Sequence, residues 1–516
     1  MNAKSPLAGT PLSQLKKRPF SDRHIGPGPD DQAEMLRTLG LSSVNELVDQ
    51  IIPETIRMPN ELKLDQGLTE HQALAELQEI ARENTVNRSF IGQGYYPTRI
   101  PPVIKRNVLQ NPAWYTAYTP YQPEISQGRM ESLVNFQQVI MDLSGLDLAN
   151  ASLLDEATAA AEAMALCKRG NRRSKSNVFF AADDLHPQTL DVLRTRAAYM
   201  DIDLVVAPAD DISKHEPFGA AFQYPGTDGN IPDLEALIKT ASEQGAMVSV
   251  ASDLLALMLL RSPGELGADI VFGSAQRFGV PMAYGGPHAA FFAARDNLKR
   301  MIPGRIIGVS KDSRDQPAFR MAMQTREQHI RREKATSNIC TAQALLANLA
   351  AFFAVYHGPE GLRKQAERVH RLTAILAEGL KAGGLKPQER YFDTLSFEAD
   401  DAVHERAHNA GCNLRRLADG RVGISLDETT GEDDVALLLE IVLGSGHGQS
   451  VAELDASITG GATTGITPDM RRQDAVLTHP VFNRYHSETE LLRYIRRLEN
   501  RDFSLVHGMI PLGSCT

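Results

Sequence analysis

The sequence predicts an α/β protein, in which a large domain with a mostly parallel β-sheet is followed by a smaller α+β domain. Two patterns carry this prediction. Between about residues 130 and 310, strand-like apolar runs alternate with helical segments, which is typical of βαβ units covered on both faces. Between about 360 and 445, one long helix precedes short strands. The composition, 42% hydrophobic and 23% charged residues, is that of a globular protein.

Each element of these domains is inferred from local periodicity. Apolar residues at helical spacing predict helices, and short runs rich in β-branched and aromatic residues predict strands. In the large domain the expected helices span 131–143, 152–168, 187–199 and 232–242, and the expected strands span 177–182, 203–207, 246–251 and 269–272. In the smaller domain we expect a helix over 361–380 and strands near 391–398 and 421–426.

The ends of the chain show other patterns. The first 33 residues are rich in Pro, Gly and Ser and predict an arm and a turn. Helices then begin at Asp30 and after Thr69, which has capping-box spacing to Gln72. A Gly- and Thr-rich linker at 457–467 precedes a charged tail with a helix over 488–500. The expected regions are an arm with helices (1–87), the large domain (88–355), the small domain (356–456) and a linker with a tail (457–516).

A proline- and aromatic-rich segment at 88–130 opens the large domain. It contains six of the 31 aromatic residues of the chain between residues 95 and 121, including the single tryptophan. Its prolines bias the preceding residues toward extended backbone, so a regular element is not expected. Two interpretations stay open. The segment is either a loop that wraps the core with packed aromatic rings, or a loop that presents tyrosine hydroxyls to a pocket.

Charge and cysteine content exclude several classes of protein. The formal charge is 54 − 64 = −10, which argues against a nucleic-acid-binding protein. The four cysteines form no CxxC pair, so neither a disulfide scaffold nor a metal site is expected, and a reducing compartment is favoured. No apolar run is long enough to span a membrane. The basic first 18 residues lack the apolar core of a secretory signal, and a disordered arm is favoured over an organelle-targeting segment.

Several long motifs identify a family. They are RHIGP at 23–27, YTAYTPYQPE at 115–124, SLLDEAT at 152–158, FGSAQRFG at 272–279, residues 321–340, LTHPVFNRY at 477–485 and PLGSCT at 511–516. Together they resemble the P-protein of the glycine cleavage system, glycine dehydrogenase (decarboxylating). The resemblance covers nearly the whole chain from about residue 20. It implies the fold of type I pyridoxal-phosphate enzymes, with a large domain built around a mostly parallel sheet and a smaller α+β domain.

The length departs from the single-chain form of that family. That form is about twice as long and consists of two similar halves, and a two-subunit form divides earlier than the end of this sequence. The resemblance therefore implies an N-terminal half with the first piece of the second half, as a truncated product or a fragment. The family places its cofactor lysine in the C-terminal half.

The equivalent cofactor site of this half can be tested residue by residue. Pyridoxal phosphate needs a lysine, a carboxylate for the pyridine nitrogen, a group over the ring and a phosphate cup at a helix start. Asp253 suits the carboxylate that faces the pyridine nitrogen, and His186 suits the group over the ring. The lysine position holds Arg277, which stays protonated and cannot form a Schiff base. The helix start carries Asp155 and Glu156, which would repel a phosphate. Neither Lys311 nor Lys334 falls in the expected place, so no cofactor site is expected here.

The aromatic segment is then the best functional candidate. In the family the two halves pack as a pseudo-dimer, and the non-catalytic half lends residues to the single cofactor site. Tyr95, Tyr96, Tyr118 and Glu124 are the candidates, because a hydroxyl can orient a carboxylate or a sulfur and a carboxylate can hold a proton. Cys340 borders the active-site mouth in relatives, which makes a redox role conceivable beside the default of a buried, unreactive thiol.

The resemblance also implies the reaction and the partners. Glycine is decarboxylated with pyridoxal phosphate, CO2 is released, and the aminomethyl group passes to the lipoyl arm of the H-protein, in an oxidoreductase system with T-protein and L-protein. The expected partners further include a C-terminal half, in a homodimer or heterotetramer, in bacterial cytoplasm or a mitochondrial matrix. This chain alone is expected to be inactive. The alternatives are a non-catalytic scaffold for a separate C-terminal half, or an unstable remnant.

Overall fold

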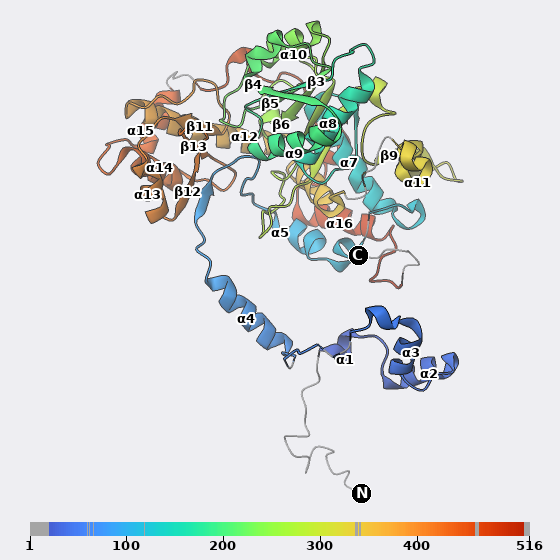
Figure 1. Ribbon diagram of the computed structural model, residues 1–516. Helices are drawn as coiled ribbons and strands as arrows, with labels where there is room; N and C mark the ends of the chain where they lie inside the picture. Colours follow the sequence, from blue (N-terminus) through green and yellow to red (C-terminus); the bar gives the residue numbers. More distant parts are fainter. Residues whose placement is uncertain are drawn as a thin grey trace. The chain divides into compact units, whose positions relative to one another are not determined.

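The computed structural model describes residues 20–58, 60, 62–65, 67–117, 119–335, 339, 342–459 and 464–509. A seven-stranded sheet forms the centre of the large domain, in the order β2-β8-β7-β6-β5-β3-β4 (Figure 1). Strands β4, β3, β5, β6 and β7 are parallel, and β8 and β2 add antiparallel pairs at one edge. The strands are β2 (Leu148–Ala149), β3 (Val178–Ala182), β4 (Asp203–Ala207), β5 (Gly219–Tyr224), β6 (Met247–Ser252), β7 (Ile270–Ser274) and β8 (Ala290–Ala294).

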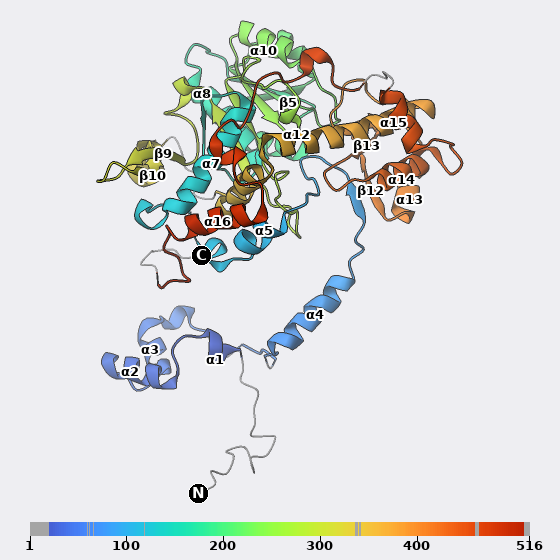
Figure 2. The ribbon, with the colours of Figure 1, turned by 180° about the vertical axis from the view of Figure 1, so that it is seen from behind.

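Helices cover both faces of this sheet, and each face has its own apolar cluster. Helices α8 and α9 pack with Phe179 and Phe272 on one face. Helices α7, α10 and α12 pack with Phe180 and Phe222 on the other face. Figure 2 shows these three helices from behind. These helices are α7 (Gln127–Ser144), α8 (Glu156–Gly170), α9 (Pro187–Tyr199), α10 (Leu234–Glu243) and α12 (Ala344–Ala382). The predicted α/β class with a mostly parallel sheet is confirmed.

A smaller α+β layer follows along the chain. Its sheet has the order β1-β12-β13-β11, with β1 parallel to β12 and the other pairs antiparallel. The elements are β1 (Arg88–Phe90), β11 (Thr394–Phe397), β12 (Cys412–Arg416), β13 (Val422–Ser425), α13 (Ala402–Asn409), α14 (Glu432–Leu443) and α15 (Val451–Thr459). The helix expected over 361–380 is the second part of α12, whose backbone leaves the helical conformation at Gly358, where φ is +62° and ψ is 179°.

Short elements make up the rest of the domain. The aromatic segment holds single turns rather than one long element, as the prolines predict: α5 (Pro102–Ile104), a π-helical turn (Lys105–Leu109), α6 (Pro112–Tyr115) and η4 (Pro123–Ile125). A hairpin of β9 (Ile306–Lys311) and β10 (Pro317–Ala322) precedes the charged run, which forms η8 (Gln324–Arg326), α11 (Gln328–Arg331) and η9 (Arg332–Lys334). Helix α16 (Glu488–Glu499) packs on α7.

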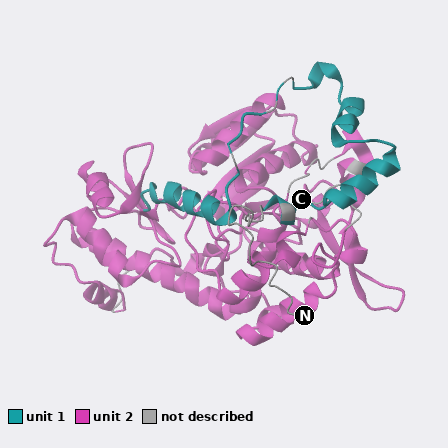
Figure 3. Ribbon diagram, turned by 90° about the horizontal axis from the view of Figure 1, so that it is seen from below, with its two compact units in different colours: residues 1–86 teal, residues 87–516 magenta. Residues whose placement is uncertain are grey.

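The chain divides into two compact units, residues 1–86 and 87–516, which Figure 3 colours separately. The described part of the first unit contains α1 (Ser21–His24), α2 (Pro29–Leu39), α3 (Val44–Ile51), η2 (Glu54–Ile56) and α4 (Glu70–Arg82). The predicted capping box of α4 is present, since Thr69 and Gln72 bond each other's backbone N–H groups. Helices α2, α3 and α4 bury none of their side chains. Within the described residues, no helix is both long and apolar enough to cross a bilayer.

Candidate functional site

The predicted site residues converge at the carboxyl edge of the large sheet. Asp253 follows β6, Arg277 follows β7, and His186 follows β3 at the start of α9. The carboxyl ends of parallel strands are where open α/β sheets hold their ligands. These side chains line one cavity together with Tyr96 and Glu156. The cavity is small, with a volume of about 30 Å³.

Arg277 fills the centre of this cavity. Its Nη1 donates to Asp253 Oδ2 at 2.8 Å and also to Asp393 Oδ2, and its Nη2 donates to the carbonyl of Leu426 at 3.4 Å. The guanidinium carbon lies 3.8 Å from the centre of the Tyr96 ring, a close cation–π contact. Only 4% of the arginine side chain is exposed. Arg277 therefore joins the large sheet, the small sheet and the aromatic segment.

The charges around Arg277 fix its protonation. Burial alone would lower the pKa of Arg277, but the carboxylates of Asp253 and Asp393 outweigh burial and hold the pKa above its ordinary value. Burial raises the pKa of Asp393, against the lowering effect of Arg277. The arginine is thus permanently cationic and paired with two carboxylates through Nη1, and a guanidinium offers no amine for covalent chemistry at this position.

Two carboxyl groups stand at the start of α8. Asp155 caps the helix, because its Oδ1 accepts from the backbone N–H of Thr158 at 2.7 Å. The backbone N–H of Glu156 donates to Nδ1 of His288 at 3.4 Å. Burial, reinforced by the charges of Asp253 and Asp155, raises the pKa of Glu156 to about 8. The helix start is thus occupied by protein carboxyl groups, as predicted.

His186 is held by contacts that leave little room above its ring. Its Nδ1 lies 2.9 Å from Oγ1 of Thr227, which also accepts from Arg415 at 2.8 Å. Burial, with the charge of Arg415, lowers the pKa of His186 to about 3, so the ring is neutral. A β-carbon on Gly94 would lie 3.3 Å from the imidazole Cδ2. The backbone of the aromatic segment therefore lies against His186.

Paired side-chain amides fasten the aromatic segment over the cavity. Gln276 accepts from the backbone N–H of Tyr96 at 3.1 Å and donates to its carbonyl at 2.8 Å. The amide of Gln93 donates to Gln188 at 2.8 Å, and Gln188 donates back to the Gln93 carbonyl at 2.9 Å. The Tyr95 ring packs on His288, with centroids 4.4 Å apart. Residues 93–96 are packed by these contacts and Tyr96 also lines the cavity, so both interpretations of the segment stay open.

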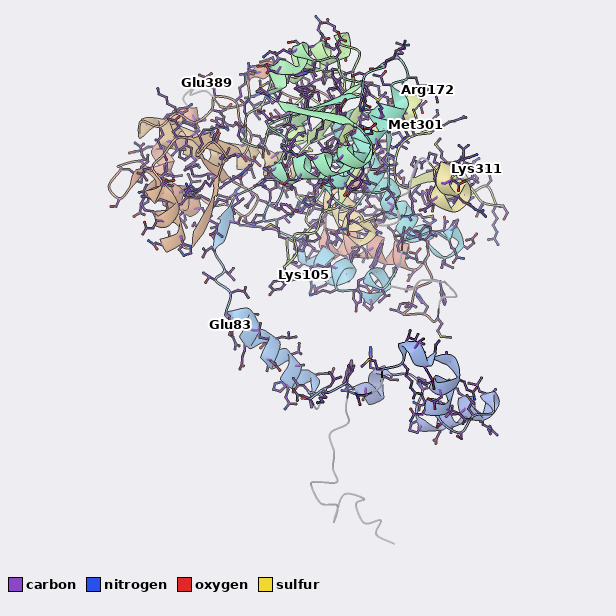
Figure 4. All side chains as sticks on the ribbon, in the orientation of Figure 1. Glu83, Lys105, Arg172, Met301, Lys311 and Glu389 are labelled. Atoms are coloured by element: carbon purple, nitrogen blue, oxygen red, sulfur yellow. The ribbon has the colours of Figure 1, made fainter. Side chains whose placement is uncertain are left out.

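The remaining candidates lie elsewhere. Glu124 is exposed on η4 and does not line the cavity. Tyr118 and Cys340 lie outside the described residues. Lys311 is exposed at the end of β9, where Figure 4 labels it, and pairs with Asp315 at 2.8 Å. Lys334 is exposed as well, at the end of η9, and neither lysine lines the cavity.

Sequence reasoning missed part of the site. Asp393, Gln276, Thr227 and His288 were not singled out, although each contacts a predicted residue. Gln276 adjoins Arg277 in the FGSAQRFG motif, so position in the motif could have indicated it. Asp393 gives no local signal, since it is 116 residues from Arg277 and meets it only through folding.

Comparison with known proteins decides the family. The family model described as glycine cleavage system P-protein matches residues 22–442. The chain belongs to this family. It is 58% identical over 509 residues to a glycine dehydrogenase (decarboxylating) of Shewanella sediminis (strain HAW-EB3) and 56% identical over 514 residues to one of Psychromonas ingrahamii (strain DSM 17664 / CCUG 51855 / 37). Each alignment covers 98% of this chain and 53% of the relative, so the chain spans about half the length of these curated relatives.

Solved structures agree with this family. A crystal structure of glycine decarboxylase (P-protein) of the glycine cleavage system, in inhibitor-bound form, superposes with a TM-score of 0.73 at 30% identity. The match covers 83% of this chain and 99% of that chain. A sphingosine-1-phosphate lyase of Burkholderia pseudomallei K96243, with a TM-score of 0.53, 15% identity and coverage of 78% and 96%, shares the fold alone. The predicted family and type I fold are confirmed.

Pyridoxal phosphate, the predicted cofactor, is the cofactor of this family. The residues of the cavity do not fit it. Arg277 stands at the position predicted for the lysine, and Asp155 and Glu156 place carboxyl groups at the helix start predicted to hold the phosphate. A cavity of about 30 Å³ has room for about two water molecules, whereas sites for molecules of cofactor size measure about 300 Å³ or more.

Proposed function

We propose that this chain acts as the cofactor-free half of a glycine-decarboxylating P-protein. The observation that carries the proposal is the bonding of Arg277, at the position predicted for the Schiff-base lysine, to Asp253 and Asp393. A guanidinium cannot take the place of the lysine amine. The lysine and the cofactor then belong to a C-terminal half, and this chain alone is inactive.

The reaction and partners proposed for the assembled protein follow from the family. Glycine would be decarboxylated in the other half, and the aminomethyl group would pass to the lipoyl arm of the H-protein, alongside T-protein and L-protein. The names of the relatives, glycine dehydrogenase (decarboxylating), support the first of these steps. The assembly would be a homodimer of fused chains or a heterotetramer of two kinds of subunit.

One comparison supports a separate folding unit. The solved P-protein chain is matched over 99% of its length by 83% of this chain, so that chain is shorter than this one. A P-protein chain of this fold thus exists without a fused second half. We infer that residues of the present chain can form the N-terminal partner of such an assembly.

The aromatic segment is the part that we propose to face the second half. Tyr95 and the two remaining candidates of the segment, Tyr118 and Glu124, would contribute to the site there. Glu124 is exposed, and Tyr95 is only half-buried. Tyr96 is buried against Arg277, so its part in this proposal is to hold its neighbour Tyr95 in place.

A second function, a scaffold without any chemistry, is favoured by four predicted cofactor-site residues whose side chains are bonded within the chain itself, namely Arg277, Asp253, His186 and Asp155. In that case the second half would be fully active alone, and this chain would only stabilise it. Kinetic comparison of the second half with and without this chain separates the two functions.

Titration with pyridoxal phosphate tests the proposal. The purified chain is expected to show no saturable absorbance band and no stoichiometric borohydride-trapped adduct, because no amine lines the cavity. A variant with Lys311→Arg and Lys334→Arg controls for adducts on exposed lysines. A one-to-one adduct that maps to the cavity would contradict the proposal.

Complementation with a C-terminal half tests the activity proposed for the assembled protein. This chain is combined with the C-terminal half of the Shewanella sediminis relative, and glycine-dependent release of CO2 is measured with lipoylated H-protein. We expect activity from the mixture and none from this chain. If the C-terminal half alone is as active as the mixture, the scaffold is the correct description.

A further inference from the structure

The position that holds the cofactor lysine in other type I enzymes is buried here and makes contacts with three parts of the fold. Asp253 belongs to the edge of the large sheet, Asp393 directly precedes β11 of the small sheet, and Tyr96 belongs to the aromatic segment. We propose that Arg277 is a positioning residue, whose guanidinium fixes the loop over residues 93–96 and so sets the place of Tyr95. The role of a fixed Tyr95 in catalysis rests on the proposed function, whereas the fixing of the loop by Arg277 does not.

The first step concerns the carboxylates. A single guanidinium faces two carboxylates, the buried Asp393 and the partly buried Asp253, so its departure would leave like charges close together in a largely enclosed site. Such a cation is held firmly and cannot swing away. The carbonyl of Leu426 accepts from the same group at 3.4 Å. Arg277 is thus a fixed point between the two sheets.

The second step leads from Arg277 to Tyr96. The guanidinium carbon lies over the Tyr96 ring, 3.8 Å from its centre. A second ring, Phe392, lies 5.6 Å from the same carbon. Stacking on an aromatic face is a property of arginine that the compact ammonium of lysine reproduces poorly. Arg277 therefore holds the side chain of Tyr96 while its neighbour Gln276 holds the backbone.

The third step leads from Tyr96 to Tyr95. With Tyr96 fixed, the adjacent ring is directed against His288 at 4.4 Å. The turn at Gly286 also borders the Tyr95 ring, since an added β-carbon there would lie 2.9 Å from Tyr95 Cε1. Tyr95 does not line the cavity, so the position of its ring depends on these contacts and on Tyr96.

Amide hydrogen exchange of the purified full chain tests the inference. In Arg277→Lys the positive charge remains but the stacking face is lost, and we expect the amides of residues 93–96 and 98 to exchange at least about tenfold faster than in the parent. Amides of β5, β6 and β7 should keep their protection. Tyr96→Leu should open the same segment, while Tyr96→Phe, which keeps the ring, should leave it protected.

Arg472→Lys is the matched control. Arg472 is equally buried, pairs with Asp474 and donates to three backbone carbonyls, yet it does not line the cavity. The Arg472→Lys substitution should lower the melting temperature without changing amide exchange in the loop that contains Tyr95 and Tyr96. The inference is overturned if Arg277→Lys and Tyr96→Leu leave the loop protected, or if Arg472→Lys opens it equally. Tyr96→Leu keeps every charge, so it decides the matter if the arginine variant fails to fold. Binding of pyridoxal phosphate would overturn the proposed function without altering these exchange rates.

Discussion

Glu156 shows how a single residue can link the site to pH. Its side chain is 6% exposed, and its Oε1 has no hydrogen-bond partner among the described residues. With a pKa of about 8, the carboxyl group is protonated in the folded protein at neutral pH. In the unfolded chain the same group ionises near 4.5. Folding therefore takes up a proton between these two values.

The sign of the effect follows from that proton. As pH rises from about 4.5 to 8, the unfolded state gains stability by ionising Glu156, so the free energy of unfolding falls, by about 3–5 kcal/mol over the window. Glu156→Gln removes this dependence. Its melting temperature should exceed that of the parent at pH 9, and the difference should shrink toward pH 5. Calorimetry across this range is the measurement.

A surface residue supplies the control for that comparison. Glu389 is exposed and labelled in Figure 4. Glu389→Gln should leave the pH profile unchanged. A Glu156→Gln profile that runs parallel to the parent would show that Glu156 is ionised in the folded state.

At the scale of elements, Gly358 decides the course of α12. Its φ of +62° with ψ of 179° is a conformation that essentially only glycine adopts. An added β-carbon would also lie 2.3 Å from His486 Cε1 and 2.8 Å from the Phe482 carbonyl oxygen. Glycine at this position lets the helix break, and Pro359 begins the second part, as proline does well at a helix start.

Gly358→Ala should therefore lower the free energy of unfolding by at least about 2 kcal/mol. Gly384→Ala is the matched control, since Gly384 also has a positive φ of +87° but nothing lies within 4 Å of its added β-carbon. That variant should cost only about 1 kcal/mol. Urea unfolding of both variants measures the difference. Equal losses would mean that backbone strain alone, without the clash, accounts for Gly358.

The elements also show what local sequence can predict. Strands β3 and β4 and helix α9 were placed within a residue of their observed ends. A Leu-Val-Val run marks β4, a proline start marks α9, and β3 is marked by Val178 with two phenylalanines. Strands β5 and β8 were not predicted. Both are rich in alanine and phenylalanine, with little β-branched content, and they become strands through pairing with neighbours in the sheet.

At the scale of the whole molecule, the same limit applies to the site. Asp253, His186 and Arg277 could be placed together from sequence, since each follows a predicted parallel strand. The second carboxylate, Asp393, could not, because docking of the small sheet against the large one brings it there. The small volume of the cavity likewise depends on the backbone path of residues 93–96, which line it in part. Local sequence does not predict that path, because the glycines in and beside this segment allow many backbone conformations.

The single tryptophan has a practical consequence for this two-unit chain. Trp114 lies in the second unit, is 3% exposed, and meets the Phe352 ring edge-on at 5.3 Å. Its fluorescence should shift to the red when residues 87–516 unfold, yet it carries no signal from a first unit without tryptophan. Far-ultraviolet circular dichroism sees the helices of both units. The difference between the two melting curves is therefore an optical record of residues 1–86 alone, obtained without a label.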